Sequence, residues 1–149
     1  MIDSDWQGWF DGAALPNPGK IGVGVVLISP AGIRSEKSAL IGGSGCNNEA
    51  ELHALCLALE IAFEAGARRL ALRGDSDVAV RYVHGPESTQ IARLAVLVAQ
   101  ARERIQGFDD VQVIWVPRHR NLDADRLSRQ ALGLPASPRK AAKGRRRSR

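Results

Sequence analysis

The sequence has little of several features that would place a chain in a special class of protein. It holds only two cysteines, Cys46 and Cys56, which form no C-x-x-C metal motif and are too few for a disulfide scaffold. No apolar run approaches the roughly eighteen residues of a membrane span, and the first residues lack the apolar segment of a signal peptide. We therefore expect a cytoplasmic protein with reduced thiols and no membrane partner.

What the sequence does contain is typical of one globular domain. Its 149 residues are 44% hydrophobic and 25% charged, which is enough to form a buried core without disulfides. No segment is repeated along the chain. We expect a monomeric protein with one folded domain over residues 1–134 and a separate tail over residues 135–149.

The basic charge of the chain is concentrated in that tail. Seven lysines and arginines lie between Arg139 and Arg149, with no acidic residue among them. Because the whole chain has 21 basic and 16 acidic residues, residues 1–138 carry 14 against 16, a net charge of −2. A disordered basic tail suits a polyanionic partner such as nucleic acid, although the same composition could serve solubility alone.

The pattern of apolar residues predicts an α/β fold. β-branched runs around a turn-rich segment at 15–20 indicate a β-meander, and apolar residues three or four apart then indicate helices. Hairpins followed by β-α-β crossovers predict a mixed five-stranded sheet, three antiparallel strands and then two parallel ones, flanked by helices. The expected elements are strands 5–11, 21–28 and 33–41, helix 48–66, strand 70–73, helices 76–84 and 91–107, strand 111–116 and helix 121–132.

Four acidic residues stand beside predicted strand ends and helix starts. Taken singly, each could serve a hairpin turn, a capping box or a helix N-terminus, and needs no function. They are Asp11 at the end of the first strand, Glu51 in the first turn of the long helix, Asp75 after the fourth strand and Asp125 early in the last helix.

Together the four carboxylates predict a metal site. Functional groups in α/β sheets gather beyond the carboxyl ends of the strands, and helix starts can reach the same edge. Four carboxylates with no base beside them repel one another unless cations neutralise them, and their oxygen ligands favour Mg²⁺ or Mn²⁺. Two such ions about 3.5–4 Å apart are the usual arrangement for phosphoryl transfer. The pattern thus indicates that class of chemistry.

The sequence blocks that contain these carboxylates resemble the type 1 ribonuclease H family. They occur in the order of the family and extend over residues 6 to about 132, and four blocks in order are far more specific than any one of them. The blocks are Trp9-Phe10-Asp11-Gly12-Ala13 with Asn17-Pro18-Gly19, Asn47-Asn48-Glu49-Ala50-Glu51-Leu52, Gly74-Asp75-Ser76, and Trp115-Val116-Pro117-Arg118-His119 with Asn121 and Ala124-Asp125.

The resemblance implies an activity, a cofactor and a partner. The implied activity is endonucleolytic hydrolysis of the RNA strand of an RNA–DNA hybrid, with two Mg²⁺ ions (or Mn²⁺ in their place) and a water nucleophile, giving 3′-hydroxyl and 5′-phosphate ends. The positions that match metal ligands of the family are Asp11, Glu51, Asp75 and Asp125. Those that match its hybrid contacts, where the 2′-hydroxyl distinguishes RNA from DNA, are Gly12, Asn17, Asn47 and Asn48.

The chain departs from the family pattern in four places. Cys46 replaces the usual threonine before the two asparagines, which would weaken a phosphate contact. Asp77 replaces a frequent glutamine, and a carboxylate there would repel phosphate or join the metal cluster. Residues 85–110 hold only three arginines, so we expect no basic protrusion of the kind that longer relatives carry. The loop before Asp125 is also short.

His119 is the predicted auxiliary catalytic residue. It lies six residues ahead of Asp125, closer than the mobile histidine of longer relatives, but it follows Val116-Pro117 as that histidine follows the last strand. An imidazole there could shuttle a proton or assist product release. Compact relatives often have V-P-R and no histidine, which makes Arg118 the rival. An exposed loop residue without a role is the third interpretation.

Two other functions fit parts of the pattern. A nuclease of the same fold that acts on DNA would keep the carboxylates, but the N-N-x-x-E and N-P-G blocks argue against it. A non-catalytic nucleic-acid binder with a decayed site would have lost some of the four carboxylates, and all four are present.

Overall fold

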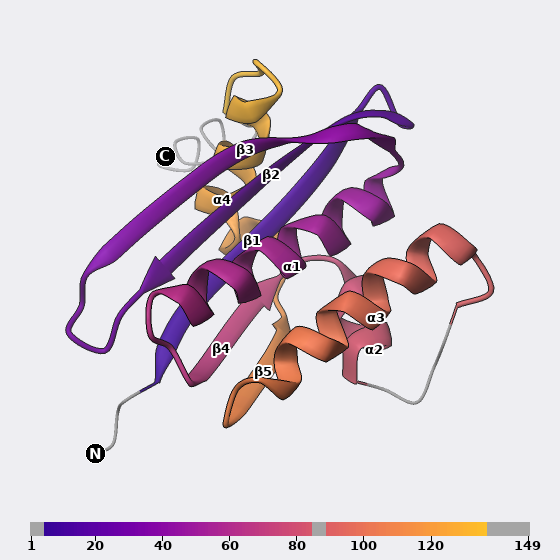
Figure 1. Ribbon diagram of the computed structural model, residues 1–149. Coiled ribbons are helices and arrows are strands. Elements are labelled where there is room, and N and C mark those ends of the chain that lie inside the picture. Colours follow the sequence, from indigo (N-terminus) through magenta and orange to yellow (C-terminus); the bar gives the residue numbers. More distant parts are fainter. Residues whose placement is uncertain (1–4, 85–88, 137–149) are drawn as a thin grey trace.

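The computed structural model describes residues 5–84 and 89–136, which form one sheet flanked by helices (Figure 1). In chain order the elements are β1 (Trp6–Leu15), β2 (Gly19–Ile28), β3 (Arg34–Gly45), α1 (Asn47–Glu64), β4 (Arg69–Gly74), α2 (Asp77–His84), α3 (Ala92–Gln106), β5 (Asp110–Trp115), the 3₁₀ turn η1 (Arg118–Arg120) and α4 (Leu122–Ala131).

The five strands form a mixed sheet in the order β3-β2-β1-β4-β5. β2 pairs antiparallel with both β1 and β3, whereas β4 pairs parallel with both β1 and β5. The predicted fold class, three antiparallel strands followed by two parallel ones, is therefore confirmed. Because β1 lies beside β4 in the middle of the sheet, residues that follow β4 can meet side chains of β1.

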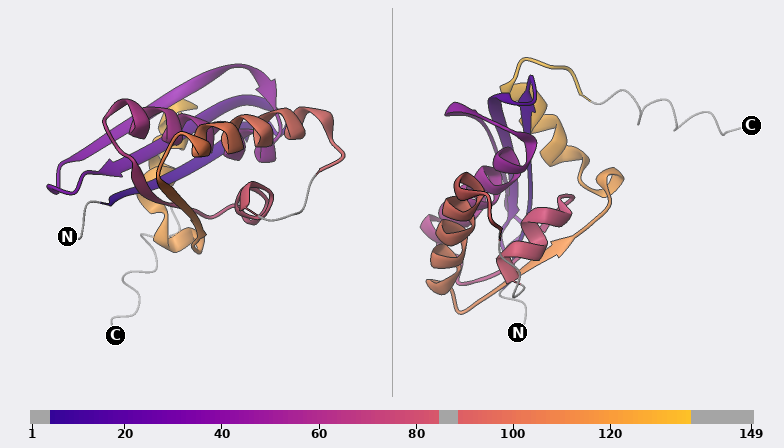
Figure 2. Two further views of the ribbon diagram at one scale, coloured as in Figure 1. Left: turned by 60° about the horizontal axis from the view of Figure 1, so that its bottom comes forward. Right: turned by 90° about the vertical axis from the view of Figure 1, so that its right-hand side faces the viewer.

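Helices cover both faces of the sheet. α1, with α2 and α3 beside it, packs on one face and α4 packs on the other, as the edge-on view in Figure 2 shows. The core lies between the sheet and α1, where Phe10, Leu52 and Leu72 are fully buried. α1 also buries a row of alanines against the sheet, and their small side chains let the helix lie close to it.

β1 extends beyond the predicted strand. The sequence pattern ends this strand at Asp11, but the structure continues it to Leu15 because residues 12–15 pair with residues 20–23 of β2. Asp11 therefore lies inside a strand, and its prediction as a strand end was wrong. The apolar pattern hid this extension because small residues, which signal turns as readily as strands, follow Asp11.

The start of α1 also differs from its prediction. The helix begins at Asn47, so Glu51 lies in its second turn. Asn48 and Glu51 are three residues apart, which is the spacing of the capping box considered for Glu51, but this pair does not form. Instead the Glu49 carboxylate accepts a hydrogen bond from the backbone N–H of Cys46 at 2.9 Å. Glu51 therefore takes no part in capping α1.

Two glycines let helices approach the sheet closely. A Cβ atom at Gly24 of β2 would lie 2.3 Å from the carbonyl oxygen of Ala124 in α4. One at Gly12 of β1 would lie 2.1 Å from the carbonyl oxygen of Ala50 in α1. Only a residue without a side chain allows such contacts. Both helices carry predicted site residues, so these glycines help to set where the carboxylates lie.

The composition gave expectations about membrane spans, cysteines and the basic tail. Within residues 5–84 and 89–136, no helix has the length and apolar character needed to cross a membrane. Both cysteines are free thiols, Cys46 partly exposed and Cys56 buried. The predicted basic tail lies, from residue 137 onward, outside the described residues.

Candidate active site

β1 continues past its parallel neighbour, which leaves one edge of the strand open. The pairing of β1 with β4 ends at Trp9 and Arg73, while β1 runs on to Leu15. Beyond this point the backbone of β1 needs other hydrogen-bond partners on that side. Three side chains supply them: Asn121 donates to the Phe10 carbonyl (2.9 Å), Glu51 accepts from the Gly12 N–H (3.3 Å) and Asn47 accepts from the Ala14 N–H (2.9 Å).

Three carboxylates gather at this open edge of β1. Asp11 belongs to β1 itself, Glu51 to α1, and Asp75 directly follows β4. Each offers one oxygen atom, and the three atoms all lie within 4.8 Å of one another. Asp11 is buried, and the other two are partly buried. Among the residues that the structure describes, no ion pair neutralises any of the three.

Burial and mutual repulsion make the charged form of this cluster costly. Burial, together with the charge of Asp75, raises the pKa of Asp11 to about 8. Burial and the charge of Asp11 raise the pKa of Glu51 well above its usual value, and burial raises the pKa of Asp75 as well. A cation among the three would favour their ionised forms, and hard oxygen ligands suit Mg²⁺ or Mn²⁺. The donor set therefore fits a divalent cation.

Asp125 lies beside this cluster. It lines a cavity of about 290 Å³ together with Asp11 and Glu51, and its charge contributes to the raised pKa of Asp11. Its oxygens do not belong to the group that lies within 4.8 Å. The structure thus brings three of the four predicted metal ligands together, and the fourth shares this acidic cavity with two of them, Asp11 and Glu51.

Ser128 helps to hold α4 against β1. This residue is fully buried, and its hydroxyl lies within hydrogen-bonding distance of Asp11 Oδ2 (3.3 Å) and of the backbone carbonyl of Asp125 (2.9 Å). One side chain therefore links the carboxylate on β1 to the helix turn that carries Asp125.

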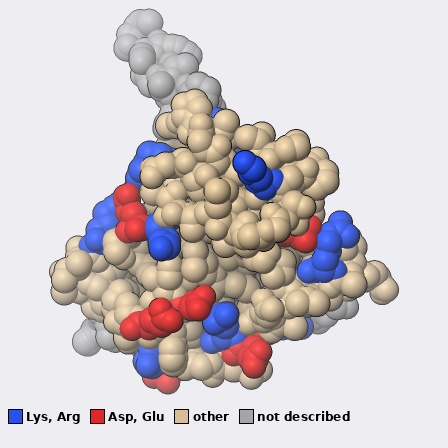
Figure 3. Space-filling view, turned by 45° about the horizontal axis from the view of Figure 1, so that its top comes forward, with Lys and Arg blue, Asp and Glu red and all other residues tan. Residues whose placement is uncertain are grey.

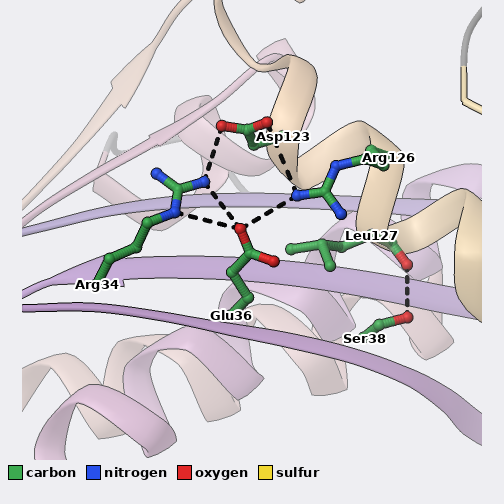
Figure 4. Close-up of polar contacts among 6 residues, drawn as sticks. All are labelled: Arg34, Glu36, Ser38, Asp123, Arg126 and Leu127. Atoms are coloured by element: carbon green, nitrogen blue, oxygen red, sulfur yellow. Dashed lines mark hydrogen bonds and ion pairs between the residues drawn. The ribbon is translucent and has the colours of Figure 1, made fainter.

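A network of charged side chains ties β3 to the first turns of α4 (Figure 4). Two arginines and two carboxylates balance each other, and Ser38 adds a hydrogen bond of 2.7 Å to the Leu127 carbonyl. Exposed ion pairs contribute little stability singly, but this network fixes α4 from the side opposite Asp11. The pairs are Arg34–Glu36 (2.9 Å), Arg34–Asp123 (2.8 Å), Arg126–Glu36 (3.1 Å) and Arg126–Asp123 (3.8 Å).

Arg118 lines the acidic cavity, whereas His119 does not. The positive charge of Arg118 lowers the pKa of Asp75, against the larger effect of burial. His119, the next residue in η1, lines a separate cavity beside Trp9. Of these two neighbours, only Arg118 shares a cavity with Asp11, Glu51 and Asp125. The placement favours Arg118 over His119, the residue predicted from the sequence, for the auxiliary role.

The asparagines predicted to contact a hybrid are exposed on one side of the acidic cavity. Asn17 Oδ1 accepts from the Asn47 backbone N–H at 3.0 Å, and Asn47 Oδ1 accepts from the Ala14 N–H at 2.9 Å. These bonds direct both amide nitrogens elsewhere, where they can donate to a ligand. Asn48 is exposed beside them, whereas Gly12 is buried under α1. The close packing of α1 on β1 is enough to require a glycine at position 12, whether or not this residue contacts nucleic acid.

The other departures from the family pattern have structural outcomes. Asp77 is exposed and pairs with Arg81 at 3.0 Å, so it does not join the acidic cluster.

Glu49, which caps α1 beside Cys46, also accepts from Arg93 Nε at 3.0 Å, and this bond ties α3 to the start of α1. Between α2 and α3, the residues that the structure describes form no further helix or strand.

Asn121 is a site residue to which the sequence pattern gave no role. It is 1% exposed, and its Nδ2 donates to the Phe10 carbonyl and to Asp75 Oδ2, each at 2.9 Å. Its Oδ1 is buried without a partner in the described part of the chain. The signals were its place in the fourth family block and at the start of the last expected helix. Asparagine at a helix start marks an N-cap, and this does not show that the side chain turns inward to hold Asp75.

Comparisons with known proteins agree with this geometry. A family model described as "Reverse transcriptase-like" matches residues 9–131. The chain is 42% identical over 125 residues to ribonuclease HI of Halobacterium salinarum, a match that covers 83% of this chain and 62% of that protein. It is 33% identical over 128 residues to the bifunctional protein Rv2228c of Mycobacterium tuberculosis, covering 85% and 35%. The chain therefore spans less than two thirds of the length of either relative.

Solved structures of related domains superpose closely. Ribonuclease H1 of H. salinarum has a TM-score of 0.82 at 39% identity, covering 87% of this chain and 98% of that one. The N-terminal ribonuclease H domain of Rv2228c has a TM-score of 0.81 at 31% identity, covering 88% and 95%. LC11-RNase H1, isolated from compost and crystallised with an RNA/DNA hybrid, has a TM-score of 0.71 at 30% identity, covering 86% and 96%.

The sheet order, the open edge of β1 and its acidic cavity define a ribonuclease H-like domain. With the match over residues 9–131 and the similarity to these structures, the chain belongs to the type 1 ribonuclease H family.

Proposed function

We propose that this chain is an endonuclease that hydrolyses the RNA strand of RNA–DNA hybrids with two Mg²⁺ ions. The observation that carries the proposal is the cluster of Asp11, Glu51 and Asp75, whose oxygens lie within 4.8 Å of one another. None of the three forms an ion pair within the described part of the chain. Family membership and the similarity to ribonucleases H support the choice of reaction.

The four carboxylates would hold the ions in the acidic cavity. Asp11, Glu51 and Asp75 form the compact part of the site, and Asp125 reaches it from α4. Bound Mg²⁺, or Mn²⁺ in its place, would supply an activated water molecule and neutralise charge that develops on the phosphate. The products expected from that reaction carry 3′-hydroxyl and 5′-phosphate ends.

Three other side chains would assist from fixed positions. Asn121 orients Asp75 through its 2.9 Å hydrogen bond, and Ser128 does the same for Asp11 at 3.3 Å. Arg118 places a positive charge at the cavity, where its guanidinium can contact a phosphate as product leaves. Fixed ligands are needed because small displacements of reacting groups slow such reactions strongly.

The exposed asparagines supply the contact to the hybrid. Asn17 and Asn47 are held by their Oδ1 atoms, so their amide nitrogens can donate to acceptors in a shallow groove. Donors there can recognise the 2′-hydroxyl that distinguishes RNA from DNA. A relative, LC11-RNase H1, has been crystallised with an RNA/DNA hybrid.

The basic tail would supply long-range attraction to the polyanion. Residues 1–138 carry a net charge of −2, and the face in Figure 3 shows basic and acidic side chains in small separate groups between wide uncharged areas. Seven positive charges in the tail can displace condensed counterions from the phosphates. We expect a monomer that acts in the cytoplasm, where free thiols stay reduced.

The test is cleavage of three labelled duplexes of one sequence: hybrid, DNA and RNA. With Mg²⁺ or Mn²⁺ we expect only the RNA strand of the hybrid to be cut, with 3′-hydroxyl and 5′-phosphate ends. Cleavage of the DNA duplex would instead indicate a DNA nuclease on the same fold. Binding without cleavage would indicate a non-catalytic binder. Chimeric strands with a single ribonucleotide would then show whether such sites are cut.

A further inference from the structure

A second cavity, of about 380 Å³, adjoins the acidic one and has no role in the chemistry described above. Consecutive residues line the two cavities, since Arg118 lines the acidic one and His119 the second one. Asn121 of the second cavity also donates to Asp75 at 2.9 Å. The residues that give the second cavity its character are Trp9, Arg34, His119, Arg120 and Asp123.

This cavity lies at the opposite end of the open edge of β1 from the predicted hybrid contacts. Trp9 and Asp11 point to the same face of the strand because side chains alternate, and they lie about 7 Å apart along it. Asn47 contacts β1 at Ala14, on the other side of Asp11. A nucleic-acid strand that runs from Asn47 across the carboxylates therefore reaches Trp9 next, roughly two stacked nucleotide steps of ~3.4 Å beyond Asp11.

The lining combines an aromatic surface with uncompensated positive charge. Trp9 lines the cavity and is only partly buried. The guanidinium of Arg73, which is not part of this lining, lies 5.0 Å from the centroid of the Trp9 ring. Arg120 is exposed and forms no ion pair among the residues that the structure describes. The carboxylate of Asp123, in contrast, is neutralised by Arg34 at 2.8 Å (Figure 4). An aromatic ring beside a free arginine is the combination that binds single-stranded nucleic acid, through base stacking and phosphate contact.

We propose that this second cavity is a subsite for single-stranded RNA that extends beyond the hybrid being cut. Trp9 stacks one unpaired base, and Arg120 contacts a phosphate of the same strand. The inference rests on the proposed function, which places the RNA strand on the carboxylates. It adds a preference: a hybrid that continues into single-stranded RNA is a better substrate than a blunt one.

The test is a competition between two hybrids with the same paired sequence, incubated in one tube with the full chain and Mg²⁺. One hybrid is blunt, and the other carries an unpaired RNA extension of about four nucleotides. Separate series place the extension at the 5′ and at the 3′ end. For one polarity we expect kcat/KM of the extended hybrid to be at least about fivefold higher, which is the lower end of the contribution of one stacked base.

Variants of two cavity residues then test whether the preference for the extended hybrid depends on this cavity. Arg120→Ala and Trp9→Leu should bring the ratio of extended to blunt cleavage close to one. Arg120 is exposed, so its variant keeps the test valid if Trp9→Leu folds poorly. Arg104→Ala, which removes a charge from the exposed last turn of α3, is the matched control and should keep the full preference.

Each other outcome overturns a specific part of the inference. Cleavage of the blunt hybrid with no preference for either extension, or a preference that survives in Arg120→Ala, would show that the cavity is not a subsite. The same competition with the extension on the DNA strand tests the strand assignment, and an Arg120-dependent preference there would mean that the wrong strand has been assigned. Failure to cut any hybrid would contradict the proposed function itself, and the subsite with it.

Discussion

Among single residues, Asp11 shows most clearly how the site opposes the stability of the fold. Its side chain is 6% exposed and shares a small volume with the carboxylates of Glu51 and Asp75. A buried charge without a partner is costly, and this residue sits in the central strand of the sheet. The protein without metal therefore gains from keeping a proton on Asp11, whereas catalysis needs that proton removed.

Without divalent cations, the stability of the protein should fall as pH rises from about 4 to about 8. The pKa of Asp11 in the folded state, about 8, lies above its ordinary value of 3.8, so the folded state holds this proton more tightly than the unfolded state. The stabilisation is complete below pH 4 and is lost as pH rises through 8. Urea unfolding in EDTA across this range measures it.

Asp11→Asn is the control for this pH dependence. The variant removes both the titrating group and its repulsion, so its stability in EDTA should exceed that of the wild type at pH 8, and its dependence on pH should be flatter. A wild-type stability that does not change between pH 4 and 8 would contradict the raised pKa of Asp11.

Variants of Arg118 and of its neighbour His119 test which of the two residues has the auxiliary role. Arg118→Ala should lower kcat for hybrid cleavage more than His119→Ala does, because only Arg118 lines the acidic cavity. Steady-state rates on a blunt hybrid at saturating Mg²⁺ give the comparison. If His119→Ala has the larger effect on kcat, the assignment based on the sequence would hold instead.

At the level of elements, the packing of α4 on β2 decides where Asp125 lies. Gly24→Ala should destabilise the protein by about 1–3 kcal/mol, as overpacking of a tight contact does, because its Cβ would lie 2.3 Å from the Ala124 carbonyl. Cleavage should also slow, since α4 must move away from Asp11. Gly42→Ala is the matched control, because its Cβ meets nothing within 4 Å. Similar urea midpoints for both variants would contradict this role of Gly24.

The same elements show what the sequence can and cannot predict. Helices and strands follow from apolar periodicity, so their order, the sheet class and three converging carboxylates were predictable. The extension of β1 to Leu15 was not, because small residues fit a turn as well as a strand. The inward turn of Asn121 and the position of His119 in the second cavity depend on how loop side chains pack, and no spacing rule encodes that packing.

At the level of the whole molecule, charge is divided between a body and a tail. Residues 1–138 are net −2 although the proposed partner is a polyanion, and the seven tail charges reverse the balance to +5 overall. Affinity for nucleic acid should therefore depend on the tail, while the chemistry depends on the body, since every proposed metal ligand lies in the body.

Removal of residues 139–149 should raise KM for the hybrid at moderate salt and leave the chemical step largely intact. Each lost phosphate contact should flatten the slope of log affinity against log salt by roughly 0.7–0.9. Hybrid affinity of the full-length and truncated chains across a salt series measures this change. Parallel slopes would show that the tail does not touch the substrate, which would leave solubility or a protein partner as its role.

The most direct test of the metal site is single-turnover cleavage of a labelled hybrid by Asp75→Asn beside the wild type at saturating Mg²⁺. The substitution keeps the shape of the side chain and removes the charge that follows β4. We expect the rate to fall by about a thousandfold or more, equivalent to ~4 kcal/mol of transition-state stabilisation, while circular dichroism shows an intact fold. A folded Asp75→Asn variant with near-normal Mg²⁺-dependent cleavage would contradict the assignment of this cluster as the catalytic centre.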